Sequence, residues 1–158
     1  MFREMRRKNQ EIPESECMQI LESEKRGVLA VNGDQGYPYA VPMNFYYDPA
    51  EHRIYLHSAK AWHKLDAVRK QNKICFTVWE QGFKKPGDWA YYVRSVIVFG
   101  KIEILRDPEL IREKVKLLGL KYYPTEQEVL RTMEKHLKNL ELLAVQIESM
   151  TGKLVHEK

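Results

Sequence analysis

The sequence predicts a mostly β fold, a small antiparallel barrel with short helices at its periphery. Three observations support this prediction. Short apolar or alternating runs, which are typical of strands, dominate the middle of the chain. Turn signals separate these runs at the spacing of small sandwiches and barrels. The chain also shows neither βαβ alternation nor a G-x-G-x-x-G turn, so a doubly wound nucleotide-binding fold is excluded.

The predicted strands are bounded by clear turn residues. Asn32-Gly33 follows the first apolar run, and Asp48-Pro49 ends an aromatic and β-branched segment. Gly100 interrupts the longest run and indicates a bulge or bend. Six strands are expected, at residues 27–31, 37–47, 53–57, 74–79, 91–105 and 140–147.

Four helices are predicted around these strands. Pro13 opens the first, with acidic residues in the first turn, and Gly27 is expected to end it. A short helix fits residues 61–70, and Asp107-Pro108 starts another that runs to about residue 120. Thr125 and Glu128 form a capping-box pattern for a helix to about residue 136. Residues 1–12 are interpreted as an N-terminal arm and residues 150–158 as a C-terminal tail.

Composition indicates one soluble globular domain over residues 1–158. The chain has 158 residues, of which 44% are hydrophobic and 30% charged, with a net charge of +4. This modest, interleaved positive excess favours anionic small ligands over nucleic acid. The two cysteines, Cys17 and Cys75, form neither a metal motif nor a disulfide framework. No apolar run approaches a membrane span and no secretory signal is seen, so we expect a cytoplasmic protein.

The densest chemical signal is the segment from His57 to Arg69. Ser58 can act as a cap or near-cap donor for the helix that follows. Lys60, His63 and Lys64 crowd the first turn of that helix, where each cation costs about 0.3–1 kcal/mol against the helix dipole. A bound phosphate would accept from the free backbone N–H groups and pair with the cations. The alternative is a solvated basic turn with a structural histidine.

Two further stretches could contribute to an anion or ring site. Arg94 and Ser95 head a strongly apolar strand, and Arg94 could reach an anion on a neighbouring strand; the alternative is a surface arginine. Pro42 cannot donate to a β ladder, so its strand is predicted to be an edge or bulged there. A flat heteroaromatic ring could hydrogen-bond to that edge, although aromatic stripes usually belong to the core.

Other chemistry has little support in the sequence. The histidines do not cluster at metal-ligand spacing, so no metal site is expected. No G-x-S-x-G, P-loop or Cys-His-Asp order is present.

Taken together, these segments resemble the pyridoxamine-5′-phosphate-oxidase-like, FMN-binding split-barrel superfamily, and within it the nitroimidazole-resistance-like group. The likeness runs in order over nearly the whole chain. The His57 segment combined with R-S-V-I-V-F-G is the most specific part. The matching residues are Met5-Arg-Arg7, Gly27-Val-Leu-Ala-Val31, Pro38-Tyr-Ala-Val-Pro42, His57-Ser-Ala-Lys60, His63-Lys64, Arg94-Ser-Val-Ile-Val-Phe-Gly100 and Thr151-Gly-Lys153.

The resemblance implies a six-stranded split barrel that forms a homodimer with FMN at the interface. The backbone of Val41, Pro42, Met43 and Asn44 would face the isoalloxazine edge. His57, Ser58 and Ala59 would lie along the flavin and ribityl chain; Lys60, His63 and Lys64 would hold the phosphate; Arg94 and Ser95 would complete the pocket. Many relatives carry a glycine where this chain has Trp62, a ring that would narrow the turn at His63.

Three functional hypotheses follow. The first is an FMN-dependent oxidoreductase acting on a small substrate, nitroaromatics or a pyridoxamine-type amine among them, in which the flavin carries the redox chemistry. The second is a non-catalytic flavin or haem carrier or sensor, with a histidine such as His57 as an axial ligand. The third, a nucleic-acid-binding barrel, is disfavoured because the positive charge is dispersed. FMN, FAD, a deazaflavin and haem all remain open as ligands.

Overall fold

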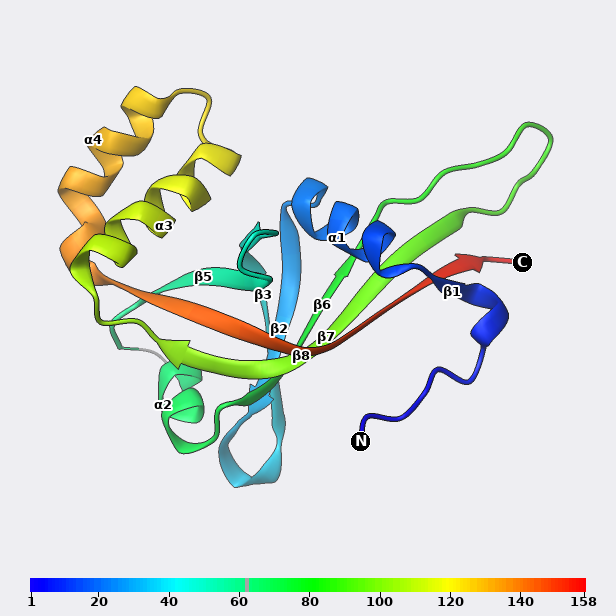
Figure 1. Cartoon of the computed structure of the whole chain (residues 1–158), viewed down its shortest axis with the longest axis horizontal. Coiled ribbons are helices and arrows are strands. Elements are labelled where there is room, and N and C mark those ends of the chain that lie inside the picture. Colours follow the sequence, from blue (N-terminus) through cyan, green and yellow to red (C-terminus); the bar gives the residue numbers. More distant parts are fainter. Residues whose placement is uncertain (62) are drawn as a thin grey trace.

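A single curled antiparallel sheet forms the body of the molecule (Figure 1). The computed structural model describes residues 1–61 and 63–158, so Trp62 and the expectation that its ring narrows the phosphate turn lie outside the described residues. Neighbouring strands follow the order β3-β2-β6-β7-β8-β5-β4, and β1 pairs with β8. The strands are β1 (Glu11–Ile12), β2 (Arg26–Asn32), β3 (Pro38–Asn44), β4 (Tyr46–Asp48), β5 (Arg53–Ala59), β6 (Lys73–Trp79), β7 (Tyr92–Ile104) and β8 (Leu140–His156).

The two longest strands, β7 and β8, form the spine of this sheet. Their pairing runs from Tyr92 opposite His156 to the far end of β7, and the first half of β8 also pairs with β5. The register shifts between Phe99 and Gly100, where a Cβ atom on Gly100 would overlap the carbonyl oxygen of Gln146. The predicted bulge at Gly100 is therefore confirmed, and glycine is required there by close backbone approach.

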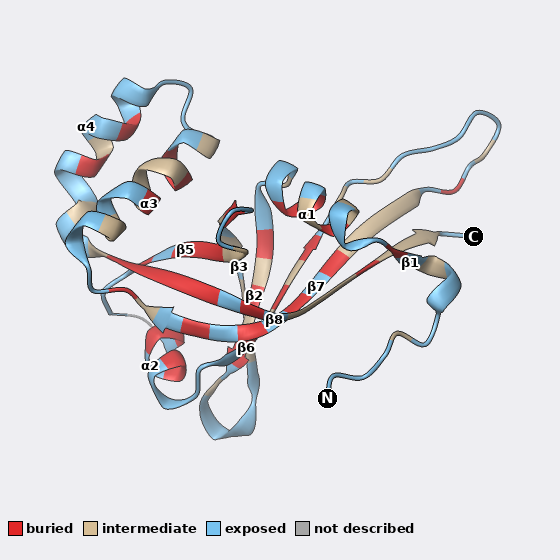
Figure 2. Cartoon of the chain, in the orientation of Figure 1, coloured by how far each residue is buried: buried red, intermediate tan, exposed pale blue. Residues whose placement is uncertain are grey.

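The concave side of the sheet encloses the main core (Figure 2). Phe45, Ile54, Phe76 and Val98 are fully buried within it. Helix α1 (Glu14–Ser23) packs over strands β4, β6, β7 and β8 and buries Cys17, Ile20 and Leu21. Burial of these side chains is the main source of stability.

The remaining helices lie outside the sheet. Helix α2 (His63–Lys70) packs against β2. Helices α3 (Pro108–Tyr122) and α4 (Glu126–His136) form a hairpin between β7 and β8 that projects at one end of the molecule (Figure 1). The Asp107 side chain accepts hydrogen bonds from the N–H groups of Glu109 and Leu110, and Thr125 accepts from the N–H of Glu128, so both predicted helix starts are confirmed.

The antiparallel, mostly β class is confirmed, but the described residues contain eight strands instead of six. The predicted strand at 37–47 is interrupted at Phe45, which separates β3 from β4. The Tyr122 hydroxyl accepts a hydrogen bond from the Phe45 N–H at 2.8 Å, and it lies 2.7 Å from the Phe45 carbonyl oxygen. This side chain satisfies backbone groups that a sheet partner would otherwise satisfy.

Parts of both chain ends belong to the sheet, whereas the sequence predicts an N-terminal arm and a C-terminal tail. β8 continues to His156, beyond the expected end at residue 147, so most of the segment 150–158 belongs to the sheet. Within the expected arm, Glu11 and Ile12 pair with Lys153 and Gly152. Glycine is needed at residue 152 because a Cβ atom there would overlap the Cys17 sulfur. Helix α1 also ends at Ser23, before Gly27, which lies inside β2.

Candidate functional site

A cavity of about 430 Å³ lies between the end of β5 and the α3–α4 hairpin. Four residues predicted to contact a flavin line one wall: Asn44 at the end of β3, and His57, Ser58 and Ala59 on β5. The opposite wall consists mainly of apolar side chains from α3 and α4. Asn44 and the segment 57–59, which are separate in the sequence, therefore meet at one cavity, whereas Val41, Pro42 and Met43 are not part of its described lining.

The edge position of β3 brings Asn44 to this cavity. Among the described strands, β3 pairs only with β2 and so ends the sheet. Its Pro42 lies where a missing N–H donor is tolerated, as the sequence predicts. β3 also contacts β5, and the side chains of Val41 and Met43 are half-buried against the core.

His57 opens onto the cavity from β5. The protein atoms around its ring, together with the charge of Lys64, lower its pKa below the ordinary value of 6.5. The ring is therefore neutral near pH 7 and can either donate or accept a hydrogen bond. No hydrogen bond joins its side chain to another described residue.

The three residues that follow His57 have different surroundings. The Ser58 hydroxyl is buried and donates to the Ala59 carbonyl at 3.0 Å, so the predicted role as a cap for the next helix is wrong. Ala59 stays on the cavity wall. Lys60 is exposed and lines a separate groove on the other side of the hairpin base, at Arg106, Arg112 and Lys138.

The start of α2 holds two of the predicted phosphate ligands. Lys64 is only 8% exposed, and burial lowers its pKa below 10.5. His63 is exposed, with its Nε2 2.9 Å from Oδ2 of Asp34 and its ring against Tyr39. Lys70 and His63 together lower the pKa of Asp34. His63 is thus already engaged with a carboxylate, whereas the α2 start near Lys64 fits an anion such as a phosphate.

Arg94 and Ser95 lie away from the cavity in this structure. β8 separates their strand, β7, from β5, and neither residue is part of the described cavity lining. The Arg94 guanidinium donates to both carboxylate oxygens of Glu80, at 2.6 and 2.9 Å, and to Glu16 at 3.1 Å. Within one chain this cation is neutralised by carboxylates.

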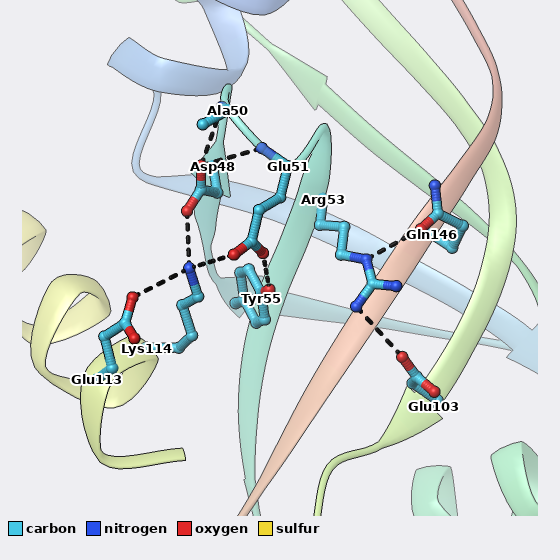
Figure 3. A network of polar contacts seen from close by, with 9 residues as sticks. All are labelled: Asp48, Ala50, Glu51, Arg53, Tyr55, Glu103, Glu113, Lys114 and Gln146. Carbon is cyan, nitrogen blue, oxygen red and sulfur yellow. Dashed lines mark hydrogen bonds and ion pairs between the residues drawn. The ribbon is translucent and has the colours of Figure 1, made fainter. Parts of the chain in front are cut away.

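A buried charge cluster anchors α3 to the sheet (Figure 3). Lys114 is 2% exposed and donates to Asp48 at 2.9 Å and to Glu51 at 2.8 Å. The Tyr55 hydroxyl also donates to Glu51. Burial opposes the charge on Lys114, but the two carboxylates raise its pKa above the ordinary value.

Sequence reasoning missed the helical wall of the cavity. Its residues recur at helical spacing along each helix, and that periodicity was the signal available. The periodicity does not indicate which strand end the α3–α4 hairpin covers. The wall comprises Val115, Leu118 and Tyr122 on α3 and Val129, Thr132 and Met133 on α4.

The described residues offer neither a metal site nor a membrane-spanning helix. No group of three or more His, Cys, Asp or Glu side chains there could hold a metal ion. No helix within 1–61 or 63–158 is both long and apolar enough to cross a membrane.

The curled antiparallel sheet with its peripheral helices defines a split-barrel protein. A family model described as pyridoxamine 5′-phosphate oxidase matches residues 13–154. The chain therefore belongs to the pyridoxamine 5′-phosphate oxidase family. Among curated proteins, no sequence matches it.

Solved structures share this fold at low sequence identity. A candidate 5-nitroimidazole antibiotic resistance protein from Bacteroides thetaiotaomicron is 23% identical, with a TM-score of 0.75 over 93% of this chain and 87% of that chain. An FAD-binding protein from Mesorhizobium loti is 21% identical, with a TM-score of 0.67 over 92% and 96%. A flavocytochrome from Azotobacter vinelandii is 20% identical, with a TM-score of 0.78 over 96% and 72%.

Proposed function

We propose that this protein is an FMN-dependent oxidoreductase that reduces a small organic substrate, nitroaromatics among them. The observation that carries the proposal is that four predicted flavin contacts line one cavity: Asn44, His57, Ser58 and Ala59. Helix α2 begins at His63, four residues after Ala59. Family membership and the flavin-binding structural neighbours support the choice of cofactor.

The residues present fit a flavin mononucleotide. The α2 start suits the phosphate, because a helix N-terminus presents backbone N–H groups and Lys64 lies in this first turn. Lys60, which the family resemblance also assigns to the phosphate, lies in the groove beside Arg106 and would have to turn toward it. His57, Ser58 and Ala59 would lie along the ribityl chain and ring, and the unpaired edge of β3 at Val41–Asn44 would face the ring edge. When bound, the flavin supplies hydride and electron transfer, and the protein binds and orients it.

A homodimer is part of this proposal. Trp79, Ile97 and Phe99 project from β6 and β7 with 53%, 43% and 43% of their surfaces exposed. Side chains of this size gathered on paired strands are typical of a covered surface. Since Arg94 and Ser95 head the same strand β7 but lie off the cavity of their own chain, a second copy would be needed to bring them to the flavin.

The compartment proposed for this activity is the cytoplasm. Cys17 and Cys75 are both free thiols. Free thiols suit a reducing compartment.

The absorbance spectrum of the purified full-length protein tests the proposal. We expect flavin bands, release of FMN on denaturation, and oxidation of NADH or NADPH when a nitroaromatic acceptor is added. A colourless protein that also fails to bind added FMN at about 50 µM, where even a weak complex would form, would reject it.

A haem-binding role is the second candidate. Two histidines, His57 and His136, line the same cavity, and one structural neighbour is a flavocytochrome. Neutral imidazole is a common haem ligand. A Soret band that appears when haem is added and is lost in His57→Ala would favour this role over flavin chemistry.

A further inference from the structure

The cavity beside β5 has no carboxylate, lysine or arginine side chain among its described lining residues. None of these sixteen residues is Asp, Glu, Lys or Arg, although such residues make up 30% of the chain. The groove on the other side of the hairpin base differs sharply, since nine of its fifteen described lining residues are charged. An ion that entered the cavity would lose water without meeting an Asp, Glu, Lys or Arg side chain in the described lining.

The helical wall of the cavity suits an apolar ring. Val115 and Leu118 on α3 and Val129 and Met133 on α4 contribute apolar side chains to this wall. The Met133 side chain can adapt to an irregular ligand surface. A volume of about 430 Å³ falls at the lower end of the range for small-molecule sites, so the ligand is compact.

Polar side chains at the cavity are available to orient such a ligand. Asn44, His57, Thr132 and His136 line it, and none makes a side-chain hydrogen bond to another described residue. A few polar groups on an otherwise apolar wall are typical of sites that select by orientation. Because His57 is neutral near pH 7, it adds no charge to this set.

We propose that this cavity binds a compact, uncharged, largely apolar ring substrate, with the α3–α4 hairpin as the wall that selects it. The inference rests on the proposed function, because it places the substrate between that wall and the residues expected to hold the flavin. It assigns substrate selection to residues 115–136, which lie outside the segments predicted to contact the cofactor.

A charge series of one ring tests the inference in the full-length, FMN-loaded protein without a reductant. Equilibrium dialysis would give dissociation constants for 4-nitrobenzyl alcohol, 4-nitrobenzoate and 4-nitrobenzylamine, which are neutral, anionic and cationic. The neutral compound should bind at least about tenfold more tightly than either ion. Equal affinities, or tighter binding of an ion, would overturn the inference without the need for any variant.

A matched pair of variants locates the binding. Thr132→Lys places an ammonium in the cavity, whereas Leu130→Lys adds the same charge to the same helix at an exposed position outside the lining. Thr132→Lys should weaken binding of the neutral compound and strengthen binding of 4-nitrobenzoate, each by about tenfold. Leu130→Lys should change neither dissociation constant. Identical responses of the two variants would place the probe elsewhere.

The FMN dissociation constant, measured in the same samples, separates this inference from the proposed function. It should be unchanged in both variants. If Thr132→Lys changed the FMN dissociation constant as much as that of the nitroaromatic probe, the flavin ring itself would fill the cavity. This result would overturn the inference. If the protein binds no FMN at all, the proposed function fails, and the same dialysis on the flavin-free protein still tests the charge preference of the cavity.

Discussion

Two lysines are buried in the described structure, and their surroundings shift their pKa values in opposite directions. Lys114 is 2% exposed and Lys64 is 8% exposed. The carboxylates of Glu51 and Asp48 outweigh the effect of burial on Lys114 and raise its pKa. For Lys64, burial dominates and lowers the pKa. The neighbouring carboxylates favour the charged form of Lys114, and an anion bound at the start of α2 would likewise favour the charged form of Lys64.

Lys114 is a structural cation, and we propose that Lys64 is a binding cation. Lys114 joins α3 to the β4–β5 turn, so its partners are fixed when the chain folds (Figure 3). Lys64 lies in the first turn of α2, where free backbone N–H groups already favour an anion. We propose that the FMN phosphate binds at this position, beside Lys64.

The largest effect is expected from Lys114→Ala. This change leaves Asp48 buried without its cation, and breaking a buried pair typically costs about 3–5 kcal/mol. Urea denaturation should show a loss of this size in the free energy of unfolding. Lys116→Ala, a half-exposed neighbour paired with Glu126, should cost less than about 1 kcal/mol. Equal losses in the two variants would show that the cluster contributes no more than a surface pair.

Lys64→Ala should weaken cofactor binding. Loss of one charge-assisted contact to the phosphate should cost about 1.5–3 kcal/mol, which corresponds to a roughly 10- to 150-fold weaker FMN complex. The control is Lys70→Ala on the same helix, where an exposed lysine pairs with Asp34. Fluorescence titration of FMN measures both variants. A larger effect of Lys70→Ala would move the phosphate to the other end of α2.

Tyr122→Phe tests the second anchor of α3. The variant removes the hydroxyl that accepts from the Phe45 N–H and lies 2.6 Å from the Lys25 carbonyl, so it leaves a backbone donor unsatisfied. We expect a loss of about 1–2 kcal/mol in the free energy of unfolding. Hydrogen exchange should show faster exchange of the Phe45 amide. A fully protected amide would mean that another group satisfies it.

The smallest effect concerns His57. The His57 side chain is exposed at the cavity, but the protein atoms around its ring, followed by the charge of Lys64, lower its pKa below 6.5. The unfolded chain then binds this proton more tightly than the folded chain, so the contribution of His57 to stability is present above pH 6.5 and is lost as the pH falls through the folded pKa. An NMR titration of the imidazole should give a pKa below 6.5, closer to 6.5 in Lys64→Ala. An identical pKa in both proteins would exclude electrostatic coupling between these residues.

Local patterns in the sequence were sufficient to predict most elements of the fold. The bulge at Gly100, the helix starts at Asp107 and Thr125 and the edge position of Pro42 all depend on neighbouring residues. The interruption at Phe45 and the pairing of Glu11 with Lys153 depend on partners distant in the chain. Such contacts leave no signature in a local pattern.

The candidate site could be predicted only in part for the same reason. The residues 57–60, 63 and 64 could be proposed from motif chemistry and 41–44 from the family resemblance. The ion pairs of His63 with Asp34 and of Arg94 with Glu80 arise from tertiary packing. The helical wall of the cavity likewise becomes apparent only when α3 and α4 are placed against β5. The sequence indicates where an anion could bind more readily than it indicates what lies opposite.

The most direct test of the central claim is a cycle of FMN and riboflavin binding to the wild-type protein and to Lys64→Ala. The two ligands differ only in the phosphate, so the cycle isolates its interaction with Lys64. We predict that Lys64→Ala weakens FMN binding at least about tenfold and leaves riboflavin binding unchanged. Equal weakening of both ligands, or of neither, would contradict the assignment of the phosphate to the start of α2.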